Sequence, residues 1–347
     1  MKRRILILLA ITLLIFRCGT SYSQDLSTLL RDKVVIGFEV NVNDSGDSYM
    51  YRYIINNGPA AKQSIWTVDL HAPLSLSVSG LSAPPNWLKV ILRDSTLILR
   101  WMSDTRVGAD AFEDSIQPGS SRSGFSIVSS GLPGILTYYA EGWADLPSFE
   151  EGMATDEIPG YYDHTPYGPG VMGKVVGPIP PPADLSPLSW TDTLVSYKHQ
   201  CIALGWLKDD KSRKQDCDDM MKGRDWYKRG EFEKFRKWEP DESWEFDHDW
   251  NSGIVQVLDR RLDKTKRELS RGDSVRARKD LEIFVMEVEM LNNLSKKLEA
   301  RNKQSEVRDR SPIMTSEAYA LLKYNAEYLI DRLPERHGKV DERRGKK

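Results

Sequence analysis

The chain has 347 residues, which is enough for two domains of ordinary size, and its 49 basic and 51 acidic side chains leave a net charge of −2. A net charge so close to zero creates no global field, and it therefore gives no reason to expect a nucleic-acid or acidic partner. Charged residues make up 29 % of the chain and are concentrated in its C-terminal half, which indicates a change of composition between two regions.

Residues 1–23 have the features of a secretory signal peptide. Three basic residues precede a run of twelve apolar residues, Ile5–Phe16, and small residues stand at the positions that signal peptidase reads before the bond after Ser23. Twelve residues are too few to cross a bilayer, which needs about 20. Cys18 offers lipid attachment as an alternative, but bulky residues precede it where such a site has small ones. We expect cleavage after Ser23 and a secreted, periplasmic or cell-surface protein without a membrane span.

Residues 33–143 predict an antiparallel β-sandwich. Short runs of alternating apolar residues are separated by polar turns, and no helical period interrupts them. The span is close to the length of one immunoglobulin-like domain, although it contains no cysteine and so lacks an inter-sheet disulfide. The first run illustrates the pattern, with one face formed by Val34, Ile36, Phe38, Val40 and Val42.

Residues 144–187 are rich in glycine, proline and tyrosine, and the stretch Pro178–Pro182 is almost entirely proline. Proline-rich stretches without periodicity act as semi-rigid spacers, so we expect an irregular segment and the domain boundary here. Four carboxylates in this segment could pair as a general acid and base in a secreted hydrolase, although such clusters are more often solvated loops. They are Glu150, Glu151, Asp156 and Glu157.

Residues 188–334 predict a helical module. Apolar side chains recur at spacings of three and four, which places them on one face of each helix. The stripe of the first helix is Trp190, Leu194, Tyr197, Cys201 and Leu204. Three more helices follow a gap, with the stripes Ile254, Leu258, Leu262, Thr265 and Leu269; Ala277, Leu281, Phe284, Val288 and Leu291; and Ala318, Leu322, Ala326, Leu329 and Leu333.

The ends of these helices are marked by cap and turn residues. Gly272 can end one helix in the left-handed conformation, and Asp273 can cap the next. The polar residues 292–312 predict a loop or a frayed extension, after which Thr315 can cap the last helix. The charged tail, residues 335–347, has no apolar stripe, and we expect it to be disordered.

The stretch 208–250 is an insertion between the first helix and the other three. Its residues 222–237 are basic with interleaved aromatic side chains, and residues 239–249 are acidic. A basic and aromatic run can bind single-stranded nucleic acid, but a secreted protein rarely meets one, and the acidic run can neutralise it. We expect a surface elaboration, and the candidate partner surface is formed by Trp226, Trp238 and Trp244.

The acidic end of the insertion is a weak candidate for calcium. Asp247, Asp249 and Asn251 stand at alternate positions, as oxygen ligands of a calcium loop do. However, Gly253 comes one position late for an EF-hand, and Leu258 stands where the bidentate Glu belongs. The alternative is that Asn251 caps the next helix.

Two cysteines remain after export, Cys201 and Cys217, and export leads to an oxidising compartment. A disulfide between them would close a short loop. The alternative is that Cys201, which lies on the apolar stripe of its helix, packs as a small apolar group.

The helical region resembles a known module, the FIMAH-type C-terminal domain of secreted bacterial proteins. The resemblance is carried by the segments Gly253-Ile254-Val255, Leu258–Leu262, Leu269–Asp273, Ala277–Val288, Ser316–Leu322 and Asn325–Ile330, which are preceded by Leu194–Gln200 and Leu204-Gly205-Trp206. The resemblance covers about residues 190–334, and the insertion 208–250 departs from it. It implies a non-catalytic accessory or interaction module.

These observations predict an α+β multidomain protein, with an N-terminal antiparallel sandwich followed by a C-terminal helical bundle. No phosphate-binding loop, G-x-S-x-G or H-E-x-x-H motif occurs, and the five histidines have no zinc spacing. We therefore expect a secreted, non-enzymatic protein without a cofactor, which binds another protein or a glycan at the cell exterior. The alternatives are a hydrolase with its site in the irregular segment and a structural cell-surface protein.

Overall fold

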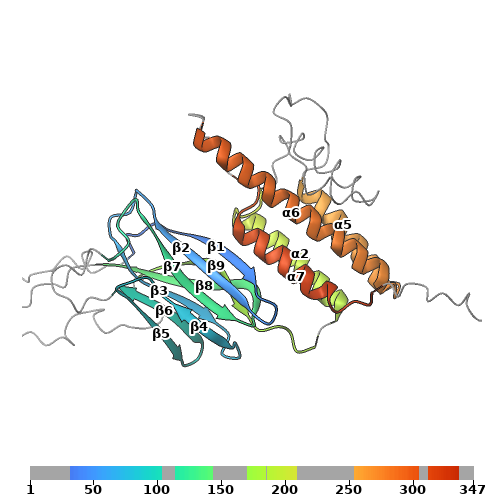
Figure 1. Ribbon diagram of the computed structural model, residues 1–347, viewed down its shortest axis with the longest axis horizontal. Coiled ribbons are helices and arrows are strands. Elements are labelled where there is room, and N and C mark those ends of the chain that lie inside the picture. The colour runs from blue at the N-terminus through green and yellow to red at the C-terminus, as the bar shows by residue number, and fades with distance from the viewer. Residues whose placement is uncertain are drawn as a thin grey trace, which may run out of the picture.

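The structure, a computed structural model, describes residues 32–103, 114–143, 170–184, 186–208, 254–304 and 312–335. In these ranges nine strands come first in the chain and four helices follow. The strands form two sheets, and the helices stand together at one side of them (Figure 1). The mixture of antiparallel sheets and helices agrees with the α+β class expected from the sequence.

All neighbouring strands pair antiparallel. The four-stranded sheet has the spatial order β1 (Ile36–Asp44), β2 (Tyr49–Asn57), β7 (Ser121–Ser129) and β4 (Val78–Ser82). The five-stranded sheet has the order β5 (Trp87–Arg93), β6 (Leu97–Ser103), β3 (Ile65–Ala72), β8 (Leu132–Gly142) and β9 (Val171–Ile179). Variable-type immunoglobulin sandwiches also have nine strands. Here β4 pairs with β7 in the four-stranded sheet, and the chain then forms β5 and β6 at one edge of the five-stranded sheet.

The two sheets pack face to face through large aromatic side chains. Along β6 buried residues alternate with half-buried ones, as expected when one face of a strand lies against a core. Trp101 of β6 is 0 % exposed, and its ring lies 5.5 Å from both Tyr53 of β2 and Phe125 of β7. Since β2 and β7 belong to the opposite sheet, these contacts join the two layers.

The expectation of an irregular segment over residues 144–187 is wrong for its second half, because β9 is a regular edge strand. It pairs with β8 from Leu132↔Ile179 to Ala140↔Val171 without a break. Two glycines and Pro178 interrupt its alternation, so the sequence pattern was weak. An edge strand tolerates proline because one side of it needs no ladder hydrogen bond.

The helices are α2 (Pro187–Ala203), α5 (Ile254–Ser270), α6 (Ser274–Gln304) and α7 (Ser316–Ile330). They form a ring in which α2 contacts α5 and α7, and α6 contacts α5 and α7. Their predicted apolar stripes are largely buried, among them Leu194, Leu258, Leu281, Phe284, Leu322 and Leu329, each 0 % exposed. Leu204 is an exception, since it follows the end of α2 and is exposed.

For residues 292–312 the sequence left a loop and a frayed extension open, and the structure shows an extension, because α6 continues to Gln304. Residues after 292 lack an apolar stripe, yet many of them are strong helix formers, and this was enough to extend the helix. The Oγ of Ser295, on this extension, accepts a hydrogen bond of 2.9 Å from the Met314 N–H and so fixes the segment before α7. Asp273 caps α6 as expected, accepting from the Arg276 N–H at 3.0 Å, whereas Thr315 precedes α7 without a side-chain cap.

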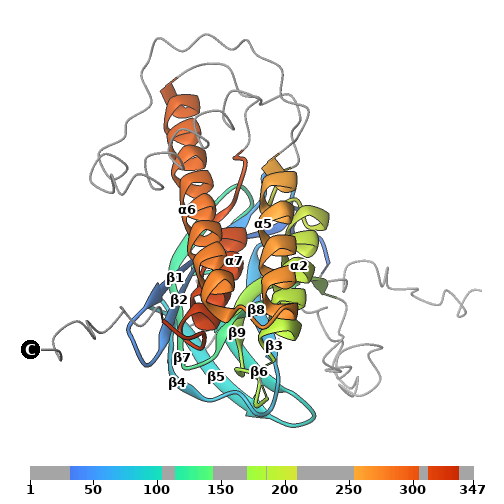
Figure 2. The same ribbon diagram turned by 90° about the vertical axis from the view of Figure 1, so that its right-hand side faces the viewer.

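Helix α7 joins the helices to the sandwich. It contacts α2 and α6 on one side and β1, β8 and β9 on the other, and α2 and α7 lie nearer the strands than α5 and α6 do (Figures 1 and 2). The buried apolar residues of both parts form one contiguous core. The sandwich and the helices are therefore packed together rather than held apart by a spacer. No described helix is both long enough and apolar enough to cross a membrane.

Candidate binding cleft between the sandwich and the helices

The site is organised by the way α7 covers the edge strand β1. Val40 and Val42 of β1 turn their backbone groups away from β2, where an edge strand leaves them without a strand partner. The carboxylate of Glu317 accepts a hydrogen bond of 3.2 Å from the Val40 N–H, and the Tyr324 hydroxyl donates one of 2.7 Å to the Val42 carbonyl. Two side chains of α7, two helical turns apart, thus replace the missing neighbouring strand.

A second set of contacts fixes α7 against the five-stranded sheet and α2. Asn325, which is 0 % exposed, donates through Nδ2 to the carbonyl of Pro133 in β8 at 2.8 Å. The indole N–H of Trp190 in α2 donates to the Asn325 carbonyl at 3.0 Å. The edge-to-face contact of Tyr49 and Tyr324, with ring centroids 5.5 Å apart, adds apolar packing at the end of β1. The position of α7 along the strand is therefore closely determined.

A cleft of about 700 Å³ opens where the cover provided by α7 ends. One wall is β1, the other is the extension of α6, and the segment leading into α7 closes one end. Its lining residues are Phe38, Glu39, Asn41, Asn292, Ser295, Lys296, Glu299, Pro312, Met314, Thr315, Ser316 and Glu317.

Carboxylates outnumber cations in the lining of this cleft. Glu39 and Glu299 are exposed on opposite walls, Lys296 is exposed on α6, and Glu317 is buried at 4 % exposure. Burial raises the pKa of Glu317 above the ordinary carboxyl value, although hydrogen bonds, including that from the Val40 N–H, oppose the shift. The exposed side chains alone leave an excess of one negative charge.

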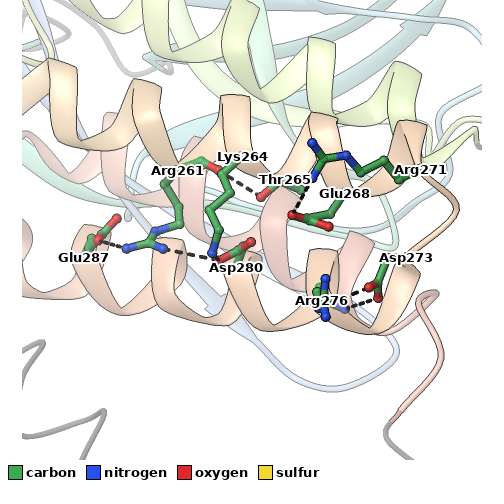
Figure 3. Close-up of polar contacts among 9 residues, drawn as sticks. All are labelled: Arg261, Lys264, Thr265, Glu268, Arg271, Asp273, Arg276, Asp280 and Glu287. Atoms are coloured by element: carbon green, nitrogen blue, oxygen red, sulfur yellow. Dashed lines mark hydrogen bonds and ion pairs between the residues drawn. The ribbon is translucent and has the colours of Figure 1, made fainter.

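A buried ion-pair network, shown in Figure 3, lies between α5 and α6 and is a second polar feature of the helices. Arg261 of α5 contacts Asp280 at 3.3 Å and Glu287 at 2.9 Å, and Lys264 contacts Asp280 at 2.7 Å. The two acidic side chains are 4 % and 1 % exposed. These side chains are paired with one another and do not line the cleft, so the network links α5 to α6 and is not part of the candidate site.

The outer face of the five-stranded sheet carries a third polar group of side chains. Arg100 binds Asp69 through two hydrogen bonds, of 2.8 and 2.6 Å, and the His71 ring lies 4.5 Å from that of Tyr139. Burial lowers the pKa of His71. These residues belong to three adjacent strands, so the pairing register alone brings them together.

Most sequence-predicted site residues lie outside the described ranges. They are the calcium candidates Asp247, Asp249 and Asn251, the partner-surface candidates Trp226, Trp238 and Trp244, Cys217, Cys18, and the carboxylates Glu150, Glu151, Asp156 and Glu157. Cys201 is described and is 0 % exposed, whereas its expected partner Cys217 is not described, so the disulfide stays a prediction. In the described part of the chain, no cluster of three or more His, Cys, Asp or Glu could hold a metal.

The residues that build the cleft were not singled out from the sequence. For the side chains that hold α7 against the strands beside the cleft, the available signal was that Glu317, Tyr324 and Asn325 are spaced to share one face of α7, distinct from the predicted apolar stripe. A polar face on an amphipathic helix is ordinarily solvated, so the pattern gave no reason to expect that it is buried.

Comparisons with known proteins add little beyond this geometry. No protein-family model matches the chain, and no curated protein matches it. Among solved structures, an uncharacterized protein from Nocardia farcinica, described as having an immunoglobulin-like fold, is similar to 40 % of this chain and 96 % of its own, at 11 % identity and a TM-score of 0.24.

Proposed function

We propose that this chain is a non-enzymatic binding protein of the cell exterior, and that its ligand binds in the cleft between β1, α6 and the segment before α7. The observation that carries the proposal is the cleft itself, at about 700 Å³. This volume lies within the range of about 300–1,000 Å³ that is usual for ligand sites. Its location at the junction of two structural units is also a common place for such sites.

The walls of the cleft are held in place from behind, which favours binding without a large ordering cost. Strand β1 pairs with β2 along its whole length, from Ile36↔Asn57 to Asp44↔Tyr49. The part of α6 that lines the cleft is tied to the segment before α7, because the Oγ of Ser295 accepts a hydrogen bond of 2.9 Å from the Met314 N–H. Nine of the twelve lining residues have polar side chains, so the cleft can make several hydrogen bonds to a ligand, and Phe38, Pro312 and Met314 add apolar surface.

Two features of the sequence support the location and the class of function. The expected signal peptide, residues 1–23, directs the chain out of the cytoplasm. The resemblance of residues 190–334 to FIMAH-type modules implies an accessory or interaction role. In this proposal the helices act as the second wall of a site whose first wall is the sandwich, and either part alone would lack the cleft.

A steric block distinguishes the cleft from the rest of the surface. The mature chain, residues 24–347, is labelled and applied to peptide and glycan arrays, alongside the variants Asn41→Trp and Asn43→Trp. Both asparagines are exposed at alternate positions of β1, but only Asn41 lines the cleft. We expect Asn41→Trp to lose the array signals and Asn43→Trp to keep them. Identical array profiles for both variants and the parent would refute the proposed site, provided that all three give the same circular dichroism spectrum.

A further inference from the structure

We propose that the cleft binds an extended peptide segment with a basic side chain, and that this segment adds to the edge of β1 at Phe38. This inference rests on the proposed function and names its class of ligand. It depends on the direction of the backbone groups of β1, on the end of the helical cover, and on the charge of the cleft walls.

The pairing of β2 shows which residues of β1 face outward. The N–H and carbonyl of Asn57 bond to Ser120 and Gly119, at 2.9 and 2.7 Å, and so point away from β1. Backbone direction alternates along a strand, so Asn56 points toward β1 and its partner there, Gly37, points back. Phe38 therefore turns its N–H and carbonyl outward.

The contacts of α7 give the same direction independently. The outward backbone groups of Val40 and Val42 bond to Glu317 and Tyr324. Backbone direction repeats at every second residue of a strand, and Phe38 stands two residues before Val40, so its N–H and carbonyl also point outward. Among the described residues no hydrogen-bond partner is found for the outward N–H and carbonyl of Phe38. Its ring turns inward instead, 4.8 Å from Tyr138, which anchors this part of the strand.

The cover that α7 provides over the edge of β1 ends at Val40 and does not reach Phe38. Helix α7 begins at Ser316, and Glu317 in its first turn already occupies the Val40 N–H. Beyond this point the edge of β1 borders the cleft rather than a packed helix. An extended peptide can add to such an edge through main-chain hydrogen bonds, which is how several peptide-binding domains work.

The charges beside this edge determine which peptide fits. A strand paired with β1 places its side chains next to those of β1, and opposite charges in such neighbouring positions are stabilising. Glu39 follows Phe38 directly, and Glu299 stands on the facing wall of α6. Lys296 opposes them with a single positive charge, so a Lys or Arg side chain of the ligand is favoured over an acidic one.

The first experiment measures binding of the mature chain to an array of pentapeptides with net charges from −2 to +2. We expect the bound set to be enriched in peptides of net charge +1 and +2. Copies of the strongest binder that are N-methylated at alternate peptide nitrogens should bind much more weakly, because they cannot form the strand ladder. Equal binding of these copies, a preference for acidic or neutral peptides, or no peptide binding would each overturn the inference.

The outcomes also separate this inference from the proposed function. If the parent binds glycans or acidic peptides and Asn41→Trp does not, the cleft is still a ligand site, but the basic peptide is not its ligand. If Asn41→Trp binds basic peptides as the parent does, both the proposed site and the inferred ligand are refuted.

Charge-neutralising variants test the residues directly. The double variant Glu39→Gln with Glu299→Gln should weaken binding of the best basic peptide about tenfold, as expected for the loss of two surface ion pairs. The matched control is Asp94→Asn with Asp263→Asn, two exposed carboxylates outside the cleft lining. Lys296→Gln should have the opposite sign and strengthen binding by about threefold. The assignment is contradicted if the double variant binds the peptide as tightly as its control variant does, or if Lys296→Gln weakens binding.

Discussion

The hydrogen bond between Tyr324 and Val42 provides a test of the idea that α7 acts as the missing neighbour of β1. Tyr324→Phe removes one hydroxyl group and leaves the ring in place against Tyr49. The Val42 carbonyl, which accepts the hydrogen bond of 2.7 Å, then has no partner from α7. Val42 is 7 % exposed, so water has little access to replace the lost donor.

The expected cost follows from leaving one buried acceptor unsatisfied. A buried hydrogen bond contributes about 0.5–1.5 kcal/mol net, and an unsatisfied buried group costs about 1–3 kcal/mol. A carbonyl is tolerated somewhat better than an N–H when it is left alone, so we expect a loss of about 1–2 kcal/mol in the free energy of unfolding. For a protein of this size that corresponds to a fall in Tm of about 1.5–3 °C.

Urea unfolding followed by tryptophan fluorescence measures this loss, with Tyr328→Phe as the matched control on the same helix. The Tyr328 ring packs against Trp190 and Arg332, and no hydrogen bond from its hydroxyl occurs among the described residues. We expect the control to change stability by less than about 0.5 kcal/mol. Equal stability of Tyr324→Phe and the parent would refute the view that α7 side chains satisfy the edge of β1.

Three further predictions concern buried groups of the helices. Burial raises the folded-state pKa of Glu317 above the ordinary carboxyl value, so its contribution to stability is present below the unfolded-state pKa and is lost as pH rises through the folded-state pKa. Glu317→Gln should abolish this decline, and parallel profiles of urea stability for the variant and the parent from pH 4 to 8 would contradict the prediction. Arg261→Leu leaves two buried carboxylates with a weakened network and should cost about 3–5 kcal/mol in thermal or urea unfolding. The control Arg276→Leu, at the more exposed pair with Asp273, should cost less than about 1 kcal/mol. Burial raises the pKa of Cys201 to about 12, so in a Cys217→Ala background its thiol should react with a disulfide reagent at pH 8 only after denaturation, and rapid labelling of the folded protein would show that it is accessible.

The local elements with a clear hydrophobic period were predictable from the sequence. The stripes of α5, α6 and α7 and the alternation along β1, β2 and β6 depend only on residues a few positions apart. Such patterns are visible whatever the rest of the chain does. Where the period was interrupted, as by the glycines and Pro178 of β9, the prediction failed. Where it was absent, as in the extension of α6, the sequence could not decide between a loop and an extended helix.

The candidate cleft could not be predicted in the same way. Its walls combine β1 with the end of α6 and the start of α7, segments separated by about 250 residues of chain, and the polar side chains involved look like ordinary surface residues. The tryptophans and acidic residues that the sequence favoured as sites lie in segments outside the described ranges, and their roles remain predictions.

The sequence alone determined the strands and helices that have an uninterrupted hydrophobic period and most of the faces that they bury, because these depend on side-chain periodicity. Only the tertiary structure decided what covers the edge of β1. Every residue carries the same backbone N–H and carbonyl, so no pattern along the chain says which distant group will satisfy them. Glu317 and Tyr324 satisfy them at Val40 and Val42, and the cover ends before Phe38, where the cleft begins.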